Sequence, residues 1–327
     1  MSNPLKVIFL GSGPIAIPLL KILASDDSIE LQAVISQLDR PAGRKRILTP
    51  TPLAAAALDM GLEVIRCADI NTPEFTAFLR EKSPDILCVV SFGQILKSTV
   101  LAIPEVACVN IHASLLPRYR GASPIVQAII NRDTQAGVCF MQMEKGLDSG
   151  PVYRTLTMDL DGSEYADDLE MAMGELAAKH AVETFHAIAE KTLPPIPQDP
   201  AGVTICRKIA KRDGVINWHH SAGDIEAMTR AYFPWPGAIA KCRNSAGKEL
   251  TVSICSARPV NIADAPPAPG ECTGKAGKLI VGCGDGTALE IMELIPSGGK
   301  RMTAAAFRNG LRGELPEFIT ETEAGLL

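Results

Sequence analysis

The sequence lacks any apolar run long enough to cross a lipid bilayer. Its longest runs, "DILCVV" and "ACVNI", end well before the roughly 20 residues that a membrane-spanning helix needs. The amino terminus also lacks the basic stretch, apolar stretch and small-residue cleavage site of a secretory signal. We therefore expect a cytoplasmic protein without a membrane partner.

Paired cysteines and clustered histidines are also missing. The nine cysteines are scattered singly and form no C-x-x-C pair, which predicts reduced core residues. Among the five histidines, the side chains of His219 and His220 diverge because the two residues are adjacent. His180 and His186 are six residues apart in a predicted helix, a spacing that does not place them on one face. We therefore predict no metal site.

Two common catalytic signatures are absent as well. Without a G-x-x-x-x-G-K-[ST] loop or a G-x-S-x-G elbow, a nucleoside triphosphatase or a serine hydrolase is disfavoured. The stretch "GSGPIA", residues 11–16, does match the dinucleotide-binding form G-x-G-x-x-A. However, Pro14 removes an amide donor, and the later Asp39 lies in a basic loop and not at a strand end. A tight strand-to-helix turn is the simpler interpretation, with a nicotinamide dehydrogenase kept as an alternative.

An excess of positive charge is lacking too. With 32 Lys and Arg against 37 Asp and Glu, the net charge is −5, so any nucleic acid must bind to local basic patches. One such patch, "DRPAGRKR" at residues 39–46, contains Arg40, Arg44, Lys45 and Arg46. A solvated surface loop is the alternative interpretation of these charges.

The order of apolar segments predicts two domains in the 327 residues. Up to residue 191, short strands alternate with helices, which predicts a mostly parallel, Rossmann-like α/β sheet with helices on both faces. Thr51 and Thr72 are expected to cap helices, and Ser163 to cap a long helix that ends at Lys191. The Pro-rich residues 192–204 are typical of a linker, and the short strands that follow predict a small OB-like β-barrel.

The side chains best suited to catalysis lie at the end of an apolar strand, in "NIHASLLPRYRG" at residues 110–121. Asn110 and His112 are two residues apart, so both side chains project from one face at the strand's end. Such a pair can donate hydrogen bonds to a carbonyl oxygen that becomes an oxyanion, and the imidazole can also transfer a proton. Asp148, in "GLDSG", could fold opposite His112 and fix its tautomer or order a water, although an ordinary turn aspartate is equally compatible with the spacing.

Together these two motifs resemble the 10-formyltetrahydrofolate-dependent formyltransferases. The pattern of that family, N-x-H-x-S-L-L-P-x-x-x-G followed by G-L-D-[ST]-G, is matched at every fixed position. The basic loop, "RKIAKRDGVINW" and "YFPWPGA" resemble segments of the members that act on methionyl-initiator tRNA. The resemblance covers nearly the whole chain.

The resemblance implies a function, a cosubstrate and site residues. A formyl group would pass from 10-formyltetrahydrofolate to the α-amine of methionyl-initiator tRNA without a metal, in a monomeric enzyme. Residues 1–191 would form the catalytic domain, 192–204 the linker, and 205–327 a tRNA-binding barrel. The catalytic residues would be Asn110, His112 and Asp148. The folate would lie against Phe92, Gly93, Ser114, Leu115, Leu116 and Pro117, and the tRNA against Arg40, Arg44, Lys45, Arg46, Lys208, Lys211 and Arg212.

Three alternatives remain open. A formyltransferase of the same superfamily could act on an amino sugar, and would fail to bind tRNA. A nicotinamide dehydrogenase would bind NADH and would not depend on Asn110. A non-catalytic tRNA-binding protein would bind tRNA but show no dependence on folate.

Overall fold

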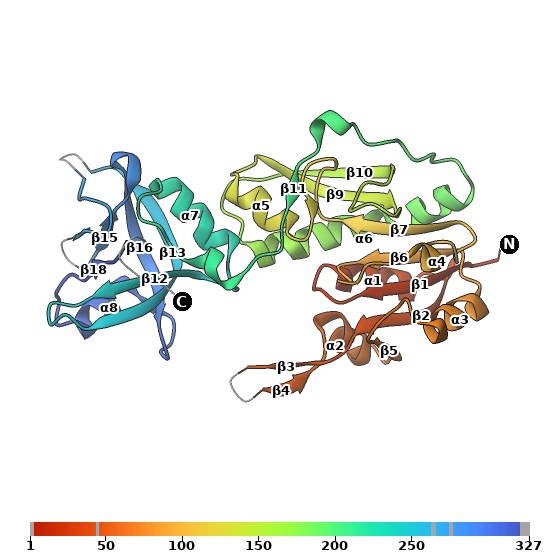
Figure 1. The fold of residues 1–327 in the computed structure, drawn as a ribbon, viewed down its shortest axis with the longest axis horizontal. Coiled ribbons are helices and arrows are strands. Elements are labelled where there is room, and N and C mark those ends of the chain that lie inside the picture. Colours follow the sequence, from red (N-terminus) through yellow and green to blue (C-terminus); the bar gives the residue numbers. More distant parts are fainter. Residues whose placement is uncertain (1–2, 44–45, 263–265, 275–276, 321–327) are drawn as a thin grey trace. The chain divides into compact units, whose positions relative to one another are not determined.

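The computed structural model describes residues 3–43, 46–262, 266–274 and 277–320 (Figure 1). The chain divides into two compact units. The first consists of the described parts of 1–124, 135–159 and 168–206, and the second of those of 125–134, 160–167 and 207–327. The predicted assignment of catalysis and tRNA binding to residues 1–191 and 205–327 stays a prediction.

The first unit is built on a seven-stranded sheet in the order β10-β9-β7-β6-β1-β2-β5. The strands from β7 to β5 pair in parallel, whereas β9 and β10 add an antiparallel edge. The prediction of a mostly parallel α/β sheet is therefore confirmed. The strands are β1 (Leu5–Gly11), β2 (Ile29–Gln37), β5 (Val64–Cys67), β6 (Ile86–Val90), β7 (Ala107–His112), β9 (Gln135–Gln142) and β10 (Val152–Asp159).

Helices cover both faces of this sheet. On one face, Leu79 and Val100 pack into a core cluster with strand residues such as Cys108. On the other, Phe185 contacts Phe140 edge to face, with ring centroids 6.2 Å apart. The helices are α1 (Ala16–Ser25), α2 (Pro52–Asp59), α3 (Pro73–Lys82), α4 (Ser98–Leu101) and α6 (Ala166–Ala189). Helix α5 (Pro124–Ile130) belongs, except for its first residue, to the second unit.

Two of the three predicted helix caps are confirmed. The hydroxyl groups of Thr51 and Thr72 accept hydrogen bonds from the first turns of α2 and α3. The prediction for Ser163 is wrong, because α6 begins only at Ala166. Ser163 instead donates through its N–H and its hydroxyl to the Asp161 carboxylate, which closes a separate turn before the helix.

The cap at Thr72 gives a stability prediction. Thr72 Oγ1 accepts from the N–H of Phe75 at 3.3 Å, so Thr72→Ala leaves that donor without its partner. We expect the free energy of unfolding of the first unit to fall by about 1 kcal/mol in Thr72→Ala and by clearly less in Thr72→Ser, as measured by urea denaturation. Equal losses in both variants would contradict a capping role.

The basic stretch after β2 forms a hairpin and not the predicted loop. Strand β3 (Arg40–Ala42) pairs antiparallel with β4 (Ile47–Thr49). A predicted tRNA contact, Arg40, therefore lies in a strand, and Arg46 has a positive φ of 49° beside the turn. The other two predicted contacts, Arg44 and Lys45, lie outside the described residues.

The second unit contains an antiparallel sheet in the order β14-β15-β16-β13-β12-β18, with β17 paired to β16. The sheet nearly closes on itself, because the N–H of Phe318 in β18 donates to the carbonyl of Gly270, just before β14, at 2.9 Å. The predicted small barrel is confirmed. Its strands are β12 (Ala238–Arg243), β13 (Glu249–Val260), β14 (Cys272–Thr273), β15 (Leu279–Gly282), β16 (Ala288–Pro296), β17 (Met302–Thr303) and β18 (Glu317–Phe318).

Two helices of this unit pack against the barrel core around Trp218. They are α7 (Ala222–Ala231) and α8 (Ala304–Gly310). Both contribute side chains to the same cluster. Short elements complete the chain: β8 (Arg120–Gly121), β11 (Ile205–Cys206) and the 3₁₀ turns η1 (Pro200–Gly202), η2 (Lys211–Gly214) and η3 (Gly284–Gly286).

The cysteines are unpaired, as predicted. All nine are free thiols, and eight of them are buried. Burial raises the pKa of Cys108, Cys242 and Cys283 to about 12, so these thiols stay protonated at neutral pH. Within the described residues, no helix combines the length and apolar character that crossing a membrane requires.

Candidate active site

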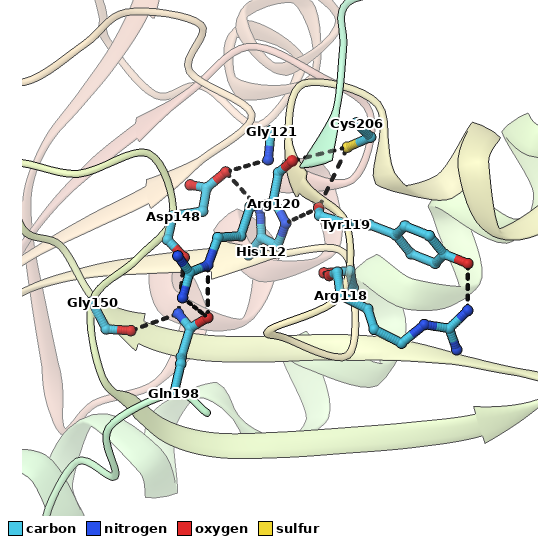
Figure 2. A network of polar contacts seen from close by, with 10 residues as sticks. His112, Arg118, Tyr119, Arg120, Gly121, Asp148, Gly150, Gln198 and Cys206 are labelled. Carbon is cyan, nitrogen blue, oxygen red and sulfur yellow. Dashed lines mark hydrogen bonds and ion pairs between the residues drawn. The ribbon is translucent and has the colours of Figure 1, made fainter. Parts of the chain in front are cut away.

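His112 is the last residue of β7, and its imidazole is held from one side by the main chain. The residue is 6% exposed, and Nε2 lies 2.9 Å from the carbonyl oxygen of Tyr119 (Figure 2). Because a carbonyl oxygen only accepts hydrogen bonds, we assign the proton of the neutral ring to Nε2. The lone pair is then on Nδ1, which makes Nδ1 the atom able to take up a proton.

Asp148 lies on the Nδ1 side of this ring. Its Oδ2 is 3.7 Å from Nδ1 and accepts a hydrogen bond from the N–H of Gly121 at 2.8 Å. The distance of 3.7 Å is too long for a hydrogen bond, so the carboxylate faces Nδ1 without bonding to it directly. The structure thus brings Asp148 opposite His112; the catalytic role of this pair stays a prediction.

Asn110 presents its amide from the same face of β7. Alternation along the strand places Cys108, Asn110 and His112 on one face, and Cys108 belongs to the core beneath it. Asn110 is half-buried, and no described residue forms a hydrogen bond with its side-chain amide. Its N–H groups are therefore available to a bound molecule.

The predicted folate contacts that follow β7 form a closed turn. The N–H of Arg118 donates to the Leu115 carbonyl at 3.1 Å, and the peptide bond between Leu116 and Pro117 is cis. Leu115, Leu116 and Pro117 are half-buried. Ser114 is 3% exposed and donates its hydroxyl to the Arg118 carbonyl, so it shapes the turn from within.

The two predicted folate contacts after β6 differ from each other. Gly93 is exposed and has a φ of +76°. Phe92 is only 2% exposed, its ring belongs to the core cluster, and its carbonyl accepts a hydrogen bond from Gln37 Nε2 at 2.6 Å. Phe92 therefore supports the strand end from inside the protein. Of the two residues, only Gly93 is exposed enough for a ligand to contact.

The Pro-rich segment predicted to be a linker also contributes to the site. Gln198 bridges Arg120 and the turn of Asp148, and the Thr204 hydroxyl accepts from the Tyr119 N–H at 2.8 Å. Cys206 Sγ donates to the carbonyl of Tyr119, the same oxygen that His112 contacts. Burial raises the pKa of the Cys206 thiol, and the nearby charge of Asp148 raises it further, so it remains a donor.

The predicted tRNA contacts of the second unit lie around the turn η2. Lys208, Lys211 and Arg212 are all exposed. Arg207, which is not among the predicted contacts, is exposed and donates to both carboxylate oxygens of Asp213. This ion pair closes the segment between Arg207 and Asp213, which contains the three other cations.

The glycine turn at residues 11–16 does not form a phosphate cradle. The N–H of Ile15 donates to the Glu170 carboxylate at 3.4 Å. A pyrophosphate bound at this turn would be repelled by that negative charge. A Cβ at Gly13 would lie 2.5 Å from the Ser91 hydroxyl, so the turn packs tightly against protein. This geometry disfavours a nicotinamide dehydrogenase. Among the described residues, no group of three or more His, Cys, Asp or Glu side chains could hold a metal ion.

Comparison with known proteins agrees with these motifs over most of the chain. Residues 5–185 match the family model described as formyl transferase, and residues 208–312 match the formyl transferase C-terminal domain. The chain belongs to the formyl transferase family. The family predicted from the sequence is therefore confirmed.

Curated relatives within this family are full-length matches. The methionyl-tRNA formyltransferase of Roseiflexus castenholzii is 38% identical over 94% of this chain and 96% of its own. That of Geobacter metallireducens is 38% identical over 95% of this chain and 97% of its own. Among solved structures, the sugar 3N-formyltransferase WlaRD, in the presence of dTDP and 5-N-formyl-THF, is similar in fold. It has a TM-score of 0.63 and 17% identity over 89% of this chain and 98% of its own.

Proposed function

We propose that this chain transfers the formyl group of 10-formyltetrahydrofolate to the α-amine of methionyl-initiator tRNA. The observation that carries the proposal is the convergence of three groups at the end of β7. These are the Asn110 amide, the Nδ1 lone pair of His112 and the Asp148 carboxylate 3.7 Å from it. The names of the full-length relatives support the choice of acceptor.

In this reaction the amine nitrogen attacks the formyl carbon and forms a tetrahedral intermediate. The carbonyl oxygen then becomes an oxyanion, to which the side-chain amide of Asn110 donates a hydrogen bond. A donor held in place before the reaction stabilises this charge without needing to reorganise. The C–N bond to the folate breaks as the oxyanion collapses to the new formamide.

His112 and Asp148 move the proton that this exchange requires. Nδ1 of His112 takes a proton from the attacking amine, and the resulting imidazolium is stabilised by the Asp148 carboxylate. The same proton is then delivered to the departing folate nitrogen. The hydrogen bond from Nε2 to Tyr119 keeps the ring in the tautomer that this step needs.

The folate is proposed to lie between the end of β6 and the turn after β7. Gly93 offers exposed main chain there, and Leu115, Leu116 and Pro117 offer partly exposed apolar surface. Phe92 and Ser114 support this wall from behind, since both are buried. In this proposal the enzyme is a monomer that acts in the cytoplasm.

The tRNA is proposed to contact Arg40, Arg44, Lys45 and Arg46 of the basic stretch at residues 39–46, and Lys208, Lys211 and Arg212 around η2. Phosphate contacts of this kind release counterions, which makes binding salt-dependent. We therefore expect the double variant Lys208→Ala/Lys211→Ala to bind tRNA more weakly and to reduce the slope of log K against log salt by about 2. Filter binding at several salt concentrations measures this, with Lys179→Ala, an exposed residue of α6, as the control. An unchanged slope would show that these two lysines do not contact the phosphates of the tRNA.

The choice of acceptor is the sharpest test of the proposed function. The protein is incubated with 10-formyltetrahydrofolate and either methionyl-tRNA or an amino-sugar nucleotide, and the formylated product is identified by mass. We expect formyl transfer to methionyl-tRNA alone. Transfer to the amino sugar alone would contradict the proposal and favour a sugar formyltransferase.

A further inference from the structure

Gln198 has every polar atom of its side chain engaged inside the candidate site. Oε1 accepts from Arg120 Nε at 3.0 Å and from Nη2 at 2.8 Å. Nε2 donates to the carbonyl oxygens of Asp148 at 2.8 Å and Gly150 at 2.7 Å (Figure 2). A guanidinium only donates and a carbonyl only accepts, so the orientation of the amide is unambiguous.

These contacts hold the turn that carries Asp148. The backbone of Asp148 has a φ of 45°, in the left-handed region that non-glycine residues seldom adopt, so the turn depends on external contacts. Gln198 holds the main chain of this turn, while the N–H of Gly121 holds the Asp148 carboxylate. Arg120, the neighbour of Gly121 in β8, anchors Gln198 from the other side.

We propose that Gln198 is a positioning residue for formyl transfer, which acts by fixing the Asp148 carboxylate against His112 Nδ1. This inference rests on the proposed function and assigns part of its machinery to the segment after α6. Gln198 acts through Asp148, with its own amide fully occupied by Arg120 and the two carbonyls. The expected effect is kinetic, because a displacement of about 1 Å at a catalytic group can cost as much as 10²-fold in rate.

The chemistry of the contacts requires an amide at this position. In Gln198→Glu the carboxylate would keep its pairing with Arg120 but would direct an oxygen at two carbonyl oxygens. The variant therefore loses both hydrogen bonds to the Asp148 turn and adds repulsion there. Gln198→Ala removes all four hydrogen bonds and retains only the main chain.

Steady-state kinetics of formyl transfer test this role. We expect Gln198→Glu and Gln198→Ala to lower kcat by about 10- to 100-fold while the KM for the folate changes less than twofold. In an Asp148→Asn background, Gln198→Glu should cause no further loss, because Gln198 acts through the Asp148 carboxylate. The control is Gln135→Ala, an exposed glutamine in β9 that bonds only to Asp159 among the described residues. Wild-type rates in the Gln198 variants would overturn the inference. So would a double variant whose loss of rate equals the product of the two single losses.

A measurement independent of activity separates this inference from the proposed function. The N–H of Gly121 donates to Asp148 Oδ2, so its hydrogen exchange reports whether the carboxylate stays in place. We expect faster exchange at Gly121 in Gln198→Ala and Gln198→Glu, and wild-type exchange in Gln135→Ala. Unchanged exchange in the Gln198 variants would overturn the positioning role. If the wild-type protein transferred no formyl group, the proposed function would fail while the exchange result would still decide the role of Gln198.

Discussion

His112→Ala is expected to slow single-turnover formyl transfer to methionyl-tRNA by about 10²- to 10⁴-fold, the usual contribution of a positioned acid–base group. The imidazole is buried, its Nε2 is engaged by the Tyr119 carbonyl, and its Nδ1 faces Asp148. Alanine removes the proton acceptor for the attacking amine and the imidazole that faces Asp148. Rapid-quench measurements with enzyme in excess report this step directly.

The control for this prediction is His180→Ala. His180 lies on α6 and contacts Glu183, outside the candidate site. We expect it to react at the wild-type rate, and both variants to bind tRNA as the wild type does. A His112→Ala rate within threefold of wild type would show that the imidazole transfers no proton in the rate-determining chemistry.

Asn110→Ala has the second large expected effect. Its amide has no hydrogen-bond partner among the described residues and lies on the same strand face as His112. Removing one oxyanion donor typically costs about 10²- to 10³-fold in kcat, or about 3 to 4 kcal/mol of barrier, and we expect a loss of this size. The KM for the folate should change little, because the hydrogen bond strengthens only as negative charge develops.

Asn110→Asp separates loss of the donor from loss of volume. It is nearly isosteric, but it replaces the N–H donor with a carboxylate oxygen that repels the oxyanion. We therefore expect Asn110→Asp to transfer formyl at least as slowly as Asn110→Ala. An aspartate variant with near wild-type kcat would contradict an oxyanion role for Asn110.

Features that depend on nearby residues could be predicted from the sequence. The caps at Thr51 and Thr72 could be predicted because each threonine directly precedes a proline at the first position of its helix. Ser163 is not a cap because α6 begins only at Ala166, and its N–H and hydroxyl donate to Asp161 in the turn before the helix. An aspartate that accepts hydrogen bonds from the residue two positions later forms a typical local turn.

The same distinction, between features set by nearby residues and features set by distant ones, holds for the candidate site. The shared face of Asn110 and His112 follows from the two-residue period of a strand, and the structure shows it. Gln198 could not be found in this way, because its partners lie 48 to 78 positions away along the chain. A glutamine in a Pro-rich stretch looks solvated until folding brings Arg120 and the Asp148 turn to it. The packing of the Phe92 ring in the core could not be predicted either, because the resemblance implies only that this residue lies near the folate.

Single-turnover transfer by the wild-type protein tests the central claim most directly. The protein, in excess, is mixed with labelled methionyl-tRNA and 10-formyltetrahydrofolate, and formylmethionyl-tRNA is followed over time. We predict complete, folate-dependent conversion in one kinetic phase, absent when the folate carries no formyl group. Failure to form formylmethionyl-tRNA, with the folate and the tRNA both shown to bind, would contradict the proposed reaction.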